Sequence, residues 1–486
     1  MIVCGKQAVD GDTAQVPSEL AAMLDIPQGS QVRAMTYDGA LLCAEQSFDE
    51  EIVTVEMRLP ALVSVVREIN DPRFPTLAGY VRALAHAVRT VTAHDLGIDP
   101  SSVGLAGSPT RVVRTHTVAF ADKARQIFSS ASDEALRAVA AKIAAVRAQV
   151  KTSPVSSSTA ASIMQTVDAS AMRGWFVVAA QDSDGRDDPA VLGLIAALAP
   201  LAARCGTKVA VLTWGNGEAY AAGGGDGLLC LHADADLSLE ARAKIIAAAA
   251  RQGAFEVLCM SAHGCGRSLA PRVAALLKTG LTADCTAFDI DETKNLLQIR
   301  PAFGGNLEAT IVCPNARPQM ATVRPGVFTQ QRAASEICLR AEIAQILMHD
   351  EGARVVSRTT IPHSDLDLSD AKIVFSGGRG TGGADGFALL GDLARKVGGA
   401  VAASRGAVDL HWAPYVRQVG QTGRTISPEL YVACGISGNI QHLAGMRSAK
   451  TVIAINKDPK AAIFALADIV IVADAKEALS RLVAMV

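Results

Sequence analysis

The stretch that decides the fold reads KIVFSGGRG (372–380), AVAASRG (400–406), LYVACGISGNIQHLAGM (430–446), TVIAINKD (451–458) and IVIVAD (469–474). Each run begins with a short apolar segment and ends in glycine or polar residues. Short apolar runs of this kind, spaced widely enough for helices between them, are typical of parallel strands buried on both faces. The predicted strands are Lys372–Phe375, Ala400–Ala403, Leu430–Ala433, Thr451–Ile455 and Ile469–Val472.

A similar alternation starts near residue 173. Strands are expected at Trp175–Ala180, Lys208–Thr213 and Phe255–Ser261, and helices at Pro189–Arg204 and Leu239–Gln252. This order of strand and helix predicts a second doubly wound parallel sheet. The expected fold class is therefore α/β, with two doubly wound parallel-sheet units at 173–328 and 371–486 and a connection at 329–370.

The first 172 residues have a different organisation. Residues 119–150 read as mainly helical, with Asp133 expected to cap the helix. Residues 151–172 are rich in Ser, Thr and Ala and read as an exposed linker. Residues 1–118 form a further region with strand-like stretches. These stretches are Gln31–Thr36, Ile52–Leu59, Ala61–Val66 and Arg111–Thr117.

Composition excludes several classes of function. The 486 residues carry a formal net charge of −2, which gives no electrostatic case for binding nucleic acid or an anionic membrane surface. The ten cysteines are scattered, and Cys259 and Cys265 flank His263 at a spacing that fits no standard metal site, so we expect none. The sequence has no signal peptide and no long apolar run, which favours a cytoplasmic protein.

Polar residues gather where the last five strands end. Ligands of open parallel sheets bind beyond the carboxyl ends of the strands. Glycines let the backbone approach a pyrophosphate, and Ser437-Gly438 opens a helix whose N-terminus favours an anion. Arg379 and Arg405 can offset negative charge, while Asn456 and Asp474 can hydrogen-bond an adenosine. Glycine at one turn can be purely structural, but five such ends predict a dinucleotide site. The pattern GxxxxGK[ST] does not occur, which argues against a P-loop site.

The same strings carry a family resemblance. SGGRG, ASRGAVD, QVGQTG, SPELY, GISGNIQHLAGM and INKDP occur in the order found in the FAD domain of the electron-transfer flavoprotein alpha subunit. Before them, GRSLAPRVAALLKTGLTAD (266–284), RPAFGGN (300–306) and RPQMATVRPGVF (317–328) resemble the first domain of that subunit. The resemblance covers about 173–486 and implies a bound FAD.

The resemblance also implies residue roles. Arg405 would lie over the isoalloxazine ring, Thr422 near its reactive edge and His442 near its pyrimidine carbonyl, so these three would tune the flavin chemistry. A positive or donor group there stabilises the anionic semiquinone. For His442 a helix-capping role is the alternative. The implied FAD contacts are Arg379, Ser404, Arg405, Val419, Gly420, Gln421, Thr422, Ser437, Gly438, Asn439, Ile440, Gln441, His442, Asn456 and Asp474.

The opening region is similar to the later part of the beta subunit, through GKQAVDGDTAQV (5–16), LPALVSV (59–65), NDPRFPTL (70–77), DLGID (95–99) and GSPTRVV (107–113). In the family the first string binds AMP in ordinary members or a second FAD in bifurcating members, and DGDTAQV resembles the bifurcating form. The residues implied are Gly5, Lys6, Gln7, Asp10, Gly11, Asp12, Thr13, Ala14, Gln15 and Val16. From the residues alone the string reads as a plain turn, with Thr13 as a helix N-cap.

Two features depart from the beta-subunit pattern. Beta subunits carry further strands before the DGDTAQV string, so we expect that a separate chain supplies them, that the second site is lost, or that the product is truncated. Leu77 is the expected anchor for a partner dehydrogenase. The following residues 82–91 read RALAHAVRTV, where the family usually has a lysine-rich stretch.

Three functions follow as hypotheses. The first is an electron carrier, rather than a stand-alone enzyme, that passes electrons on FAD from a partner dehydrogenase to an acceptor. The donor would be an enzyme such as an acyl-CoA dehydrogenase of fatty acid beta-oxidation, and the acceptor a quinone oxidoreductase or ferredoxin-type protein; the FAD domain would swing on residues 329–370. The second is a bifurcating carrier that oxidises NADH at a second flavin, completed by another chain. The third is a truncated scaffold without redox activity.

Overall fold

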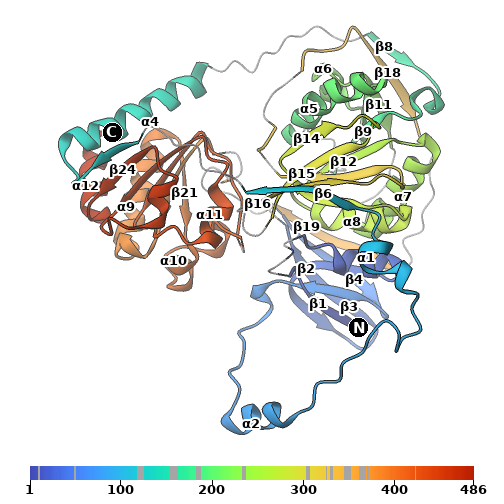
Figure 1. Ribbon diagram of the computed structural model, residues 1–486, viewed down its shortest axis with the longest axis horizontal. Coiled ribbons are helices and arrows are strands. Elements are labelled where there is room, and N and C mark those ends of the chain that lie inside the picture. Colours follow the sequence, from blue (N-terminus) through green and yellow to red (C-terminus); the bar gives the residue numbers. More distant parts are fainter. Residues whose placement is uncertain are drawn as a thin grey trace.

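The computed structural model describes residues 1–8, 11, 13–48, 51–117, 125–152, 163–181, 188–231, 237–302, 307–324, 326–328, 332–343, 352–360, 368, 371–421 and 423–486. The fold is mixed α/β with parallel sheets, as the sequence predicts. Figure 1 shows an N-terminal sheet and a middle sheet stacked together, with a C-terminal sheet beside them. We refer to these as the N-terminal, middle and C-terminal units.

The C-terminal unit contains the five predicted strands. They are β20 (Ile373–Gly377), β21 (Ala400–Ala403), β22 (Leu430–Cys434), β23 (Thr451–Asn456) and β24 (Ile469–Val472). All pair in parallel in the order β21-β20-β22-β23-β24. A sixth strand, β7 (Gln126–Phe128), adds in parallel to β24, although it lies more than 300 residues earlier in the chain.

Both faces of this sheet are buried, which explains the continuous apolar strands. Alternate residues such as Phe375 and Val432 face a core built with α9 (Ala384–Val397), α12 (Ala475–Met485) and α4 (Asp133–Thr152). Their neighbours, such as Val374 and Tyr431, face a second core that includes α11 (Ile440–Met446). The cap prediction for α4 was one residue off. The helix begins at Asp133, and the Ser132 hydroxyl accepts the hydrogen bond from the Ala135 amide at 3.2 Å.

The middle unit is an eight-stranded parallel sheet in the order β13-β17-β12-β9-β10-β11-β18-β8. The predicted strands appear as β9 (Phe176–Ala179), β10 (Val209–Thr213) and β12 (Val257–Ser261), and the predicted helices as α5 (Pro189–Cys205) and α7 (Leu239–Gly253). The remaining elements are β8 (Ile163–Thr166), α6 (Glu218–Ala222), β11 (Gly227–Cys230), α8 (Gly266–Leu277), β13 (Leu281–Cys285), β17 (Gln319–Val323) and β18 (Ile337–Glu342).

The N-terminal unit is a mixed six-stranded sheet in the order β1-β5-β2-β3-β4-β19. Its elements are β1 (Ile2–Gly5), α1 (Val16–Met23), β2 (Gln28–Tyr37), β3 (Leu41–Ser47), β4 (Glu51–Arg58), β5 (Leu62–Val65) and β19 (Ala353–Thr360). The sequence predicted β2, β4 and β5 but not β3, which alternates half-buried and buried residues because only one of its faces is covered.

Helices α7 and α8 lie between the N-terminal and middle sheets. One apolar core joins Val55, Met57 and Val63 of the first sheet to Ile246 of α7 and Leu269 of α8. A buried polar contact crosses the same boundary. The Arg272 guanidinium on α8 is 1% exposed, and it donates to the Ile26 carbonyl at 3.0 Å and to the Gln28 side chain at 3.2 Å. The two units therefore share one hydrophobic core.

Several strands join units that are far apart in the sequence. β6 (Arg111–Thr117) extends the antiparallel sheet of β14 (Ala287–Ile290), β15 (Leu296–Ala302) and β16 (Leu307–Val312). The predicted connection at 329–370 contains β18, fixed in the middle sheet, and β19, fixed in the N-terminal sheet. The predicted linker at 151–172 contains β8, which pairs with β18, while residues 153–162 lie outside the described part.

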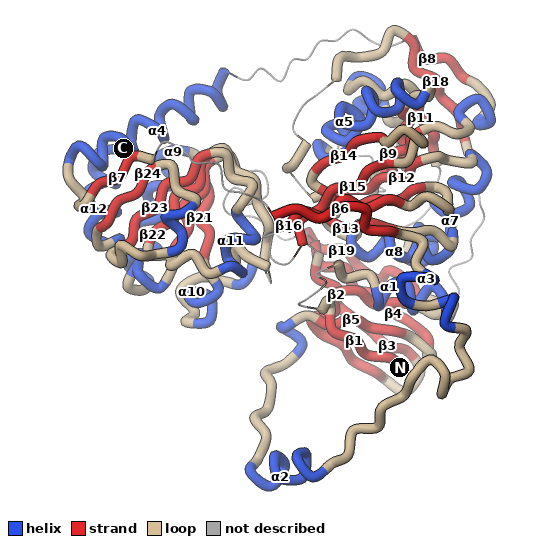
Figure 2. The backbone as a smooth tube through the Cα atoms, in the orientation of Figure 1, coloured by secondary structure: helices blue, strands red, loops and turns tan. Residues whose placement is uncertain are grey.

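A long arm leaves the N-terminal unit between β5 and β6. It carries the amphipathic helix α2 (Leu77–Ala85) far from the rest of the protein, as Figure 2 shows at the lower edge of the view. Two shorter segments of the arm are helical, namely Pro100–Ser102 and α3 (Gly104–Gly107). No residue of α2 is buried, so the helix is available to contact another molecule.

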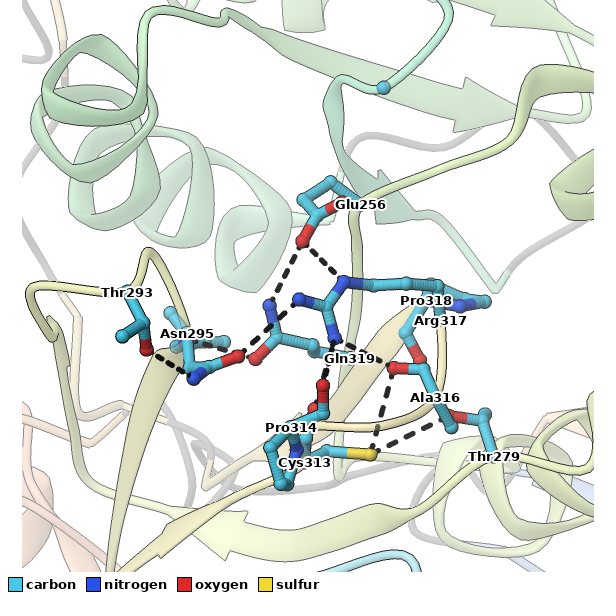
Figure 3. Close-up of polar contacts among 12 residues, drawn as sticks. Glu256, Thr279, Thr293, Asn295, Cys313, Pro314, Ala316, Arg317, Pro318 and Gln319 are labelled. Atoms are coloured by element: carbon cyan, nitrogen blue, oxygen red, sulfur yellow. Dashed lines mark hydrogen bonds and ion pairs between the residues drawn. The ribbon is translucent and has the colours of Figure 1, made fainter.

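The RPQ part of the string at 317–328 has a structural role. Arg317 pairs with Glu256 and donates to the carbonyls of Cys313 at 3.1 Å and Ala316 at 2.9 Å (Figure 3). Gln319 binds the same carboxylate and accepts from the Leu296 amide at 2.8 Å. These contacts fix the turn before β17 at the amino end of the strand, on the opposite edge of the sheet from the end where ligands bind.

Candidate functional site

The predicted loops meet at the carboxyl edge of the C-terminal sheet. After β20, the Gly378 amide donates to the Cys434 carbonyl at 2.9 Å, and the Gly380 amide donates to the Gly435 carbonyl at 3.0 Å. A Cβ on Gly378 would lie 2.3 Å from the Gly435 oxygen, so only glycine allows the two loops to approach this closely. The first and third predicted loops therefore form one surface.

The loop after β21 joins that surface. The Ser404 amide donates to the Gly377 carbonyl at 2.9 Å, and Gly406 faces the Arg379 side chain, whose Cδ would be 3.3 Å from an added Cβ. Arg379 and Arg405 are both exposed, and Ser404 is half-buried. Two cationic side chains thus stand at adjacent strand ends, where a pyrophosphate or an electron-rich ring can bind.

The QVGQ segment is fixed on α11. The Gln421 amide donates to the Gln441 carbonyl at 2.7 Å, and Val419 and Gly420 are buried. Gly420 has φ +147°, and a Cβ there would lie 2.8 Å from the same carbonyl oxygen. The structure thus brings 419–421 next to 439–442. Thr422, between Gln421 and Gly423, lies outside the described residues.

Three helices begin at this edge with free backbone amides. The N-cap residues of α9, α10 (Arg405–Asp409) and α11, which are Gly383, Ser404 and Asn439, make no side-chain capping hydrogen bond. By contrast, the Asp474 carboxylate caps α12 by accepting from the Lys476 and Glu477 amides. Uncapped helix N-termini favour anions such as phosphates. The cap occupies one oxygen of Asp474, and a ligand contact through the other remains a prediction.

Asn456 and Ser437 hold two of the loops together. The Asn456 amide group donates to the Ile436 carbonyl at 2.8 Å, and its side-chain oxygen accepts from the Asp458 amide at 3.0 Å. The Ser437 carbonyl accepts from the Ile463 amide at 3.2 Å, next to the left-handed Gly438. Both polar ends of Asn456 thus bind backbone groups, a structural role that the sequence did not predict. An adenosine contact by Asn456 stays a prediction.

Arg405 takes part in a chain of charges that reaches the N-terminal unit. Its Nε lies 3.4 Å from Asp409, and the same carboxylate accepts from Arg67 Nη1 at 2.9 Å. The hydrogen bond from Arg67 lowers the pKa of Asp409 against the opposite effect of burial, and the charges of Arg67 and Arg405 lower it further. The Arg405 side chain is 68% exposed, so it can change partner when a ligand arrives.

His442 lies in the first turn of α11 and is 6% exposed. Its Nε2 is 2.8 Å from the Tyr431 hydroxyl, and its Nδ1 is a buried atom without a hydrogen-bond partner among the described residues. Burial lowers the pKa of His442 to about 4, against the smaller opposite effect of the Val419 backbone, so the ring is neutral at pH 7. The N-cap of this helix is Asn439, so the capping alternative for His442 is wrong.

These residues fit an FAD. The glycine contacts leave a continuous backbone surface, the three uncapped helix N-termini suit a pyrophosphate, and Arg379 and Arg405 supply positive charge. Ile440 is 52% exposed at the start of α11, where an apolar side chain can contact a ring. The buried, unpaired Nδ1 of His442 can hydrogen-bond a ligand. Ser437, Asn439 and Gln441 are exposed along the same edge.

The segment expected to bind a second nucleotide lies against the middle unit. The Arg300 guanidinium donates to the Gly11 carbonyl at 3.4 Å, and the Gln15 side chain donates to the Leu281 carbonyl at 3.0 Å. Gly5 ends β1, and the Lys6 amide continues its pairing to the Val65 carbonyl at 3.0 Å. Asp10 and Asp12 lie outside the described residues, and Gln7 is half-buried.

The predicted cap at Thr13 is wrong. Helix α1 begins at Val16 with Gln15 as its N-cap, and Ala14 before it has a left-handed φ of +55°. Pro17 sits in the first turn, where its missing N–H and fixed φ are tolerated. The turn at Ala14 separates Thr13 from the helix, and Thr13 instead lines a small cavity against the middle unit.

That cavity is lined by a buried ion cluster. Asp284, at φ +64°, pairs with Arg324 at 2.7 Å and with Arg267 at 3.2 Å. Burial raises the pKa of Asp284, but Arg267 and Arg324 outweigh it and lower the pKa to about 2. Besides Thr13, the lining includes Ala262, Pro271, Leu281, Ala283 and Thr322. The second nucleotide segment therefore rests on fixed charges of the middle unit.

The predicted docking residue Leu77 lies at the end of the arm. It begins α2 and is 80% exposed. Tyr80, Val81 and Leu84 follow at helical spacing on the same face and are 56%, 56% and 71% exposed. The sequence prediction named one residue of what is an apolar helix face.

The described part of the chain contains no group of three or more His, Cys, Asp or Glu side chains that could hold a metal ion. Among its helices, none combines the length and the apolar character needed to span a bilayer.

Sequence reasoning missed three residues around the site. Tyr431 is a polar side chain inside the predicted strand LYVA, and a buried hydroxyl needs a hydrogen-bond partner, which was a usable signal. Asp409 follows Arg405 by four residues, the spacing of an ion pair on one helix face. Nothing local in the sequence indicates that Arg67 meets Asp409, because that contact depends on how the units pack.

Two sequence-family models match this chain. Residues 367–447 match the sequence model described as the electron transfer flavoprotein FAD-binding domain. Residues 1–96 and 175–345, together more than half of the chain, match the electron transfer flavoprotein domain. The chain belongs to the electron transfer flavoprotein family. Membership confirms the predicted family and the predicted FAD cofactor of this electron transfer flavoprotein.

Curated relatives match about half of this flavoprotein chain. The electron transfer flavoprotein subunit alpha of Thermoanaerobacterium thermosaccharolyticum is 51% identical over 239 residues, which cover 48% of this chain and 72% of that protein. Protein FixB of Clostridium saccharobutylicum is 48% identical over 247 residues, or 50% and 74% of the two chains. Subunit LctC of the lactate dehydrogenase (NAD(+),ferredoxin) of Acetobacterium woodii is 42% identical over 234 residues, or 47% and 55%.

Proposed function

We propose that this flavoprotein carries electrons on FAD held at the carboxyl edge of the C-terminal sheet, from a partner dehydrogenase to a separate acceptor. The observation that carries the proposal is the joining of the loops at 378–380, 404–406, 419–421 and 435–442 into one surface with three uncapped helix N-termini. The bound FAD supplies the redox chemistry. The chain supplies the phosphate site, the two cations and the neutral imidazole.

The FAD assignment is tested by reconstitution. The purified protein is stripped of flavin, titrated with FAD, and followed by the absorption spectrum and by the quenching of flavin fluorescence. One equivalent of FAD should bind at this edge, and Gly378→Val should abolish binding because the added side chain cannot fit beside Gly435. Gly391→Val on the outer side of α9, where an added Cβ meets only a distant arginine end, is the matched control. Equal binding by the two variants would reject the site.

We also propose that residues 1–118 and 119–150 correspond to the later part of a beta subunit. Support comes from the family match at 1–96 and from the way β6, β7 and α4 complete sheets of the other units. On this proposal the domains are a partial beta-like domain, a beta-type C-terminal helix, a linker at 151–172, an alpha-type first domain at 173–328, a connection at 329–370 and the FAD domain at 371–486.

The electron donor docks, in this proposal, on the apolar face of α2 that includes Leu77. From residue 72 to residue 94 the arm has three arginines and no acidic residue, so a partner with acidic groups around an apolar groove fits it. The donor class is a dehydrogenase such as an acyl-CoA dehydrogenase, and the acceptor class is a quinone oxidoreductase or a ferredoxin-type protein. Stopped-flow reduction with each donor class tests the choice.

A second candidate function is bifurcation, in which NADH is oxidised at a second flavin near residues 5–16. It is favoured by the 42% identity to a subunit of a dehydrogenase named for NAD(+) and ferredoxin, and by the contacts of Gly11 and Gln15 with the middle unit. Nucleotide extraction distinguishes one FAD, one FAD with AMP, and two FAD. Bleaching by NADH, with and without a chain that completes the N-terminal unit, tests the activity. A protein that holds one FAD and is not bleached would exclude it.

A further inference from the structure

A buried hydrogen bond between Tyr431 and His442 lies next to the proposed FAD site and bears on the proposed function. Tyr431 lies in β22, the third strand of the C-terminal sheet, and its side chain is fully buried. Its hydroxyl is 2.8 Å from His442 Nε2, and the two ring centroids are 6.2 Å apart with a 51° angle between the planes. A hydroxyl buried among apolar residues keeps such a bond because the alternative is an unpaired polar group.

The surroundings keep both partners uncharged. Tyr431 and His442 border a core that contains Val419, Leu443 and Met446. Burial raises the pKa of the Tyr431 hydroxyl, against the smaller opposite effect of Ser376, and burial lowers the pKa of His442. At neutral pH the pair therefore joins a protonated phenol to a neutral imidazole. A neutral imidazole has one N–H donor and one bare nitrogen acceptor.

The neighbours of the ring decide which nitrogen carries the proton. If the Tyr431 hydroxyl donates to Nε2, then Nδ1 carries the hydrogen. The geometry places the Tyr431 hydroxyl at Nε2, and a phenol that donates its hydrogen to that nitrogen requires the ring hydrogen to be on Nδ1. Nδ1 has no hydrogen-bond partner among the described residues, so its N–H can donate to a ligand.

We propose that Tyr431 is a positioning residue that holds His442 in the Nδ1–H form, so that a neutral donor is presented to the bound FAD. His442 touches the QVGQ segment, because a Cβ on Gly420 would lie 3.4 Å from the His442 Cα, and this segment belongs to the FAD surface described above. The proposal rests on the proposed function only in naming FAD as the acceptor. The tautomer itself is a property of the chain alone.

The first test needs no flavin. Histidine is labelled with 15N, long-range 1H–15N spectra of the FAD-free protein are recorded from pH 5 to 8, and His442 is assigned from the signals missing in His442→Gln. We expect a neutral Nδ1–H ring across this range in the wild type. Tyr431→Phe keeps the aromatic ring and removes only the hydroxyl, and it should convert most of the signal to the Nε2–H form or to a mixture of both.

The matched control is Tyr220→Phe. Tyr220 is also buried, and its hydroxyl accepts from the Asp188 amide at 3.2 Å, but it lies in the middle unit. This variant loses a buried hydroxyl without touching His442, so its His442 signals should match the wild type. If Tyr431→Phe also leaves the His442 tautomer unchanged, the positioning role is overturned, whether or not the protein binds FAD.

The second test uses the reconstituted holoprotein. Tyr431→Phe and His442→Gln should each weaken FAD binding by up to about tenfold, the effect of one lost hydrogen bond, and the double variant should be no weaker than His442→Gln. Independent, multiplicative losses would show that Tyr431 does not act through His442. Failure of all variants, including wild type, to bind FAD would reject the proposed function while the tautomer result still stands.

Discussion

Charges at the residue scale are arranged in two different ways in this flavoprotein. Arg405 and Asp409 form an exposed pair that can exchange partners, whereas the Asp284 side chain is only 7% exposed and pairs with two arginines that are largely buried. Exposed pairs contribute little to stability, and buried pairs cost much when one partner is removed. The first arrangement suits a residue that meets a ligand, and the second suits a joint between units.

Arg405→Ala should make the bound FAD harder to reduce by one electron. On the proposal that Arg405 lies beside the ring, its removal disfavours the added negative charge, and a tenfold loss would lower the one-electron midpoint potential by about 60 mV. Stepwise reduction with a reference dye measures this potential. Arg395→Ala, an exposed arginine on α9 that pairs with Asp392, is the control and should leave it unchanged. An unaltered potential in Arg405→Ala would count against its role at the ring.

Asp284→Asn should lower the free energy of unfolding by about 3 kcal/mol at pH 7, because Arg324 is left buried without its partner. The folded pKa of about 2 lies below the ordinary value of 3.8, so this stabilisation is present above pH 3.8 and is lost as the pH falls towards 2. Urea unfolding of the wild type and variant should therefore converge at low pH.

Asp289→Asn is the control for that measurement. Asp289 also pairs with an arginine, Arg204, but the pair is more than half exposed, so we expect a change of less than about 1 kcal/mol. A difference between Asp284→Asn and wild type that stays constant down to pH 2 would contradict the assignment of the lowered pKa.

At the scale of elements, α2 combines an apolar face with complete exposure. Leu77→Ala should slow electron transfer from the donor about tenfold by weakening docking, without releasing FAD, since α2 makes no buried contact with the rest of the protein. Stopped-flow rates at several donor concentrations measure it. Leu105→Ala lies on the same arm, is 95% exposed and is outside α2, so it should transfer at the wild-type rate. Identical rates for both variants would remove Leu77 from the docking surface.

A helix or strand could be predicted from the sequence when nearby residues determine it, and could not when it depends on pairing with a remote segment. The strands of the C-terminal unit were predicted to within a residue or two because burial on both faces makes them continuously apolar. β7, β8 and β19 were missed because each is a short or half-exposed edge strand that exists only through pairing with a remote segment. No local pattern specifies such a partner.

The site follows the same rule. The glycines, Arg379, Arg405 and the start of α11 could be placed together because the carboxyl ends of parallel strands share one edge. The roles of Asn456 as a link between two loops and of Asp474 as a helix cap could not be predicted. Each role depends on which backbone group lies within hydrogen-bond distance of the side chain, and the sequence does not specify this. Thr13 was misplaced because Ala14 adopts a left-handed conformation that its residue type does not favour.

At the scale of the whole molecule, the C-terminal unit is tied to the rest by more than one segment. It includes β7 and α4 as well as residues 371–486, so the chain enters or leaves it after Thr117, after Thr152 and after Thr360. A swing of the FAD domain would therefore move α4 with it and involve all three connections, not residues 329–370 alone. In the present orientation, the pair of Arg67 and Asp409 links the N-terminal and C-terminal units.

Reversing the charge of Arg67 alone should shift the orientation of the C-terminal unit. Arg67→Glu should favour other orientations by less than about 1 kcal/mol, because the pair is exposed, and Arg67→Asp with Asp409→Arg should restore the original one. Small-angle scattering at low and high salt measures the radius of gyration. This radius should rise with salt concentration in the wild type and should not change with salt concentration in Arg67→Glu. Arg354→Glu breaks an exposed pair with Glu56 inside the N-terminal unit and serves as the control. A salt-independent wild type would show that this contact does not hold the domain.

The strand exchange between the first 152 residues and the remainder has a practical consequence for handling this protein. If a protease cut the peptide between Thr152 and Ile163, β6 would still be hydrogen-bonded to β16, β7 to β24 and β19 to β4, so the two pieces would co-purify. In the uncut chain those partners can never diffuse apart. Dilution, which separates ordinary heterodimers, should leave this assembly intact at any concentration.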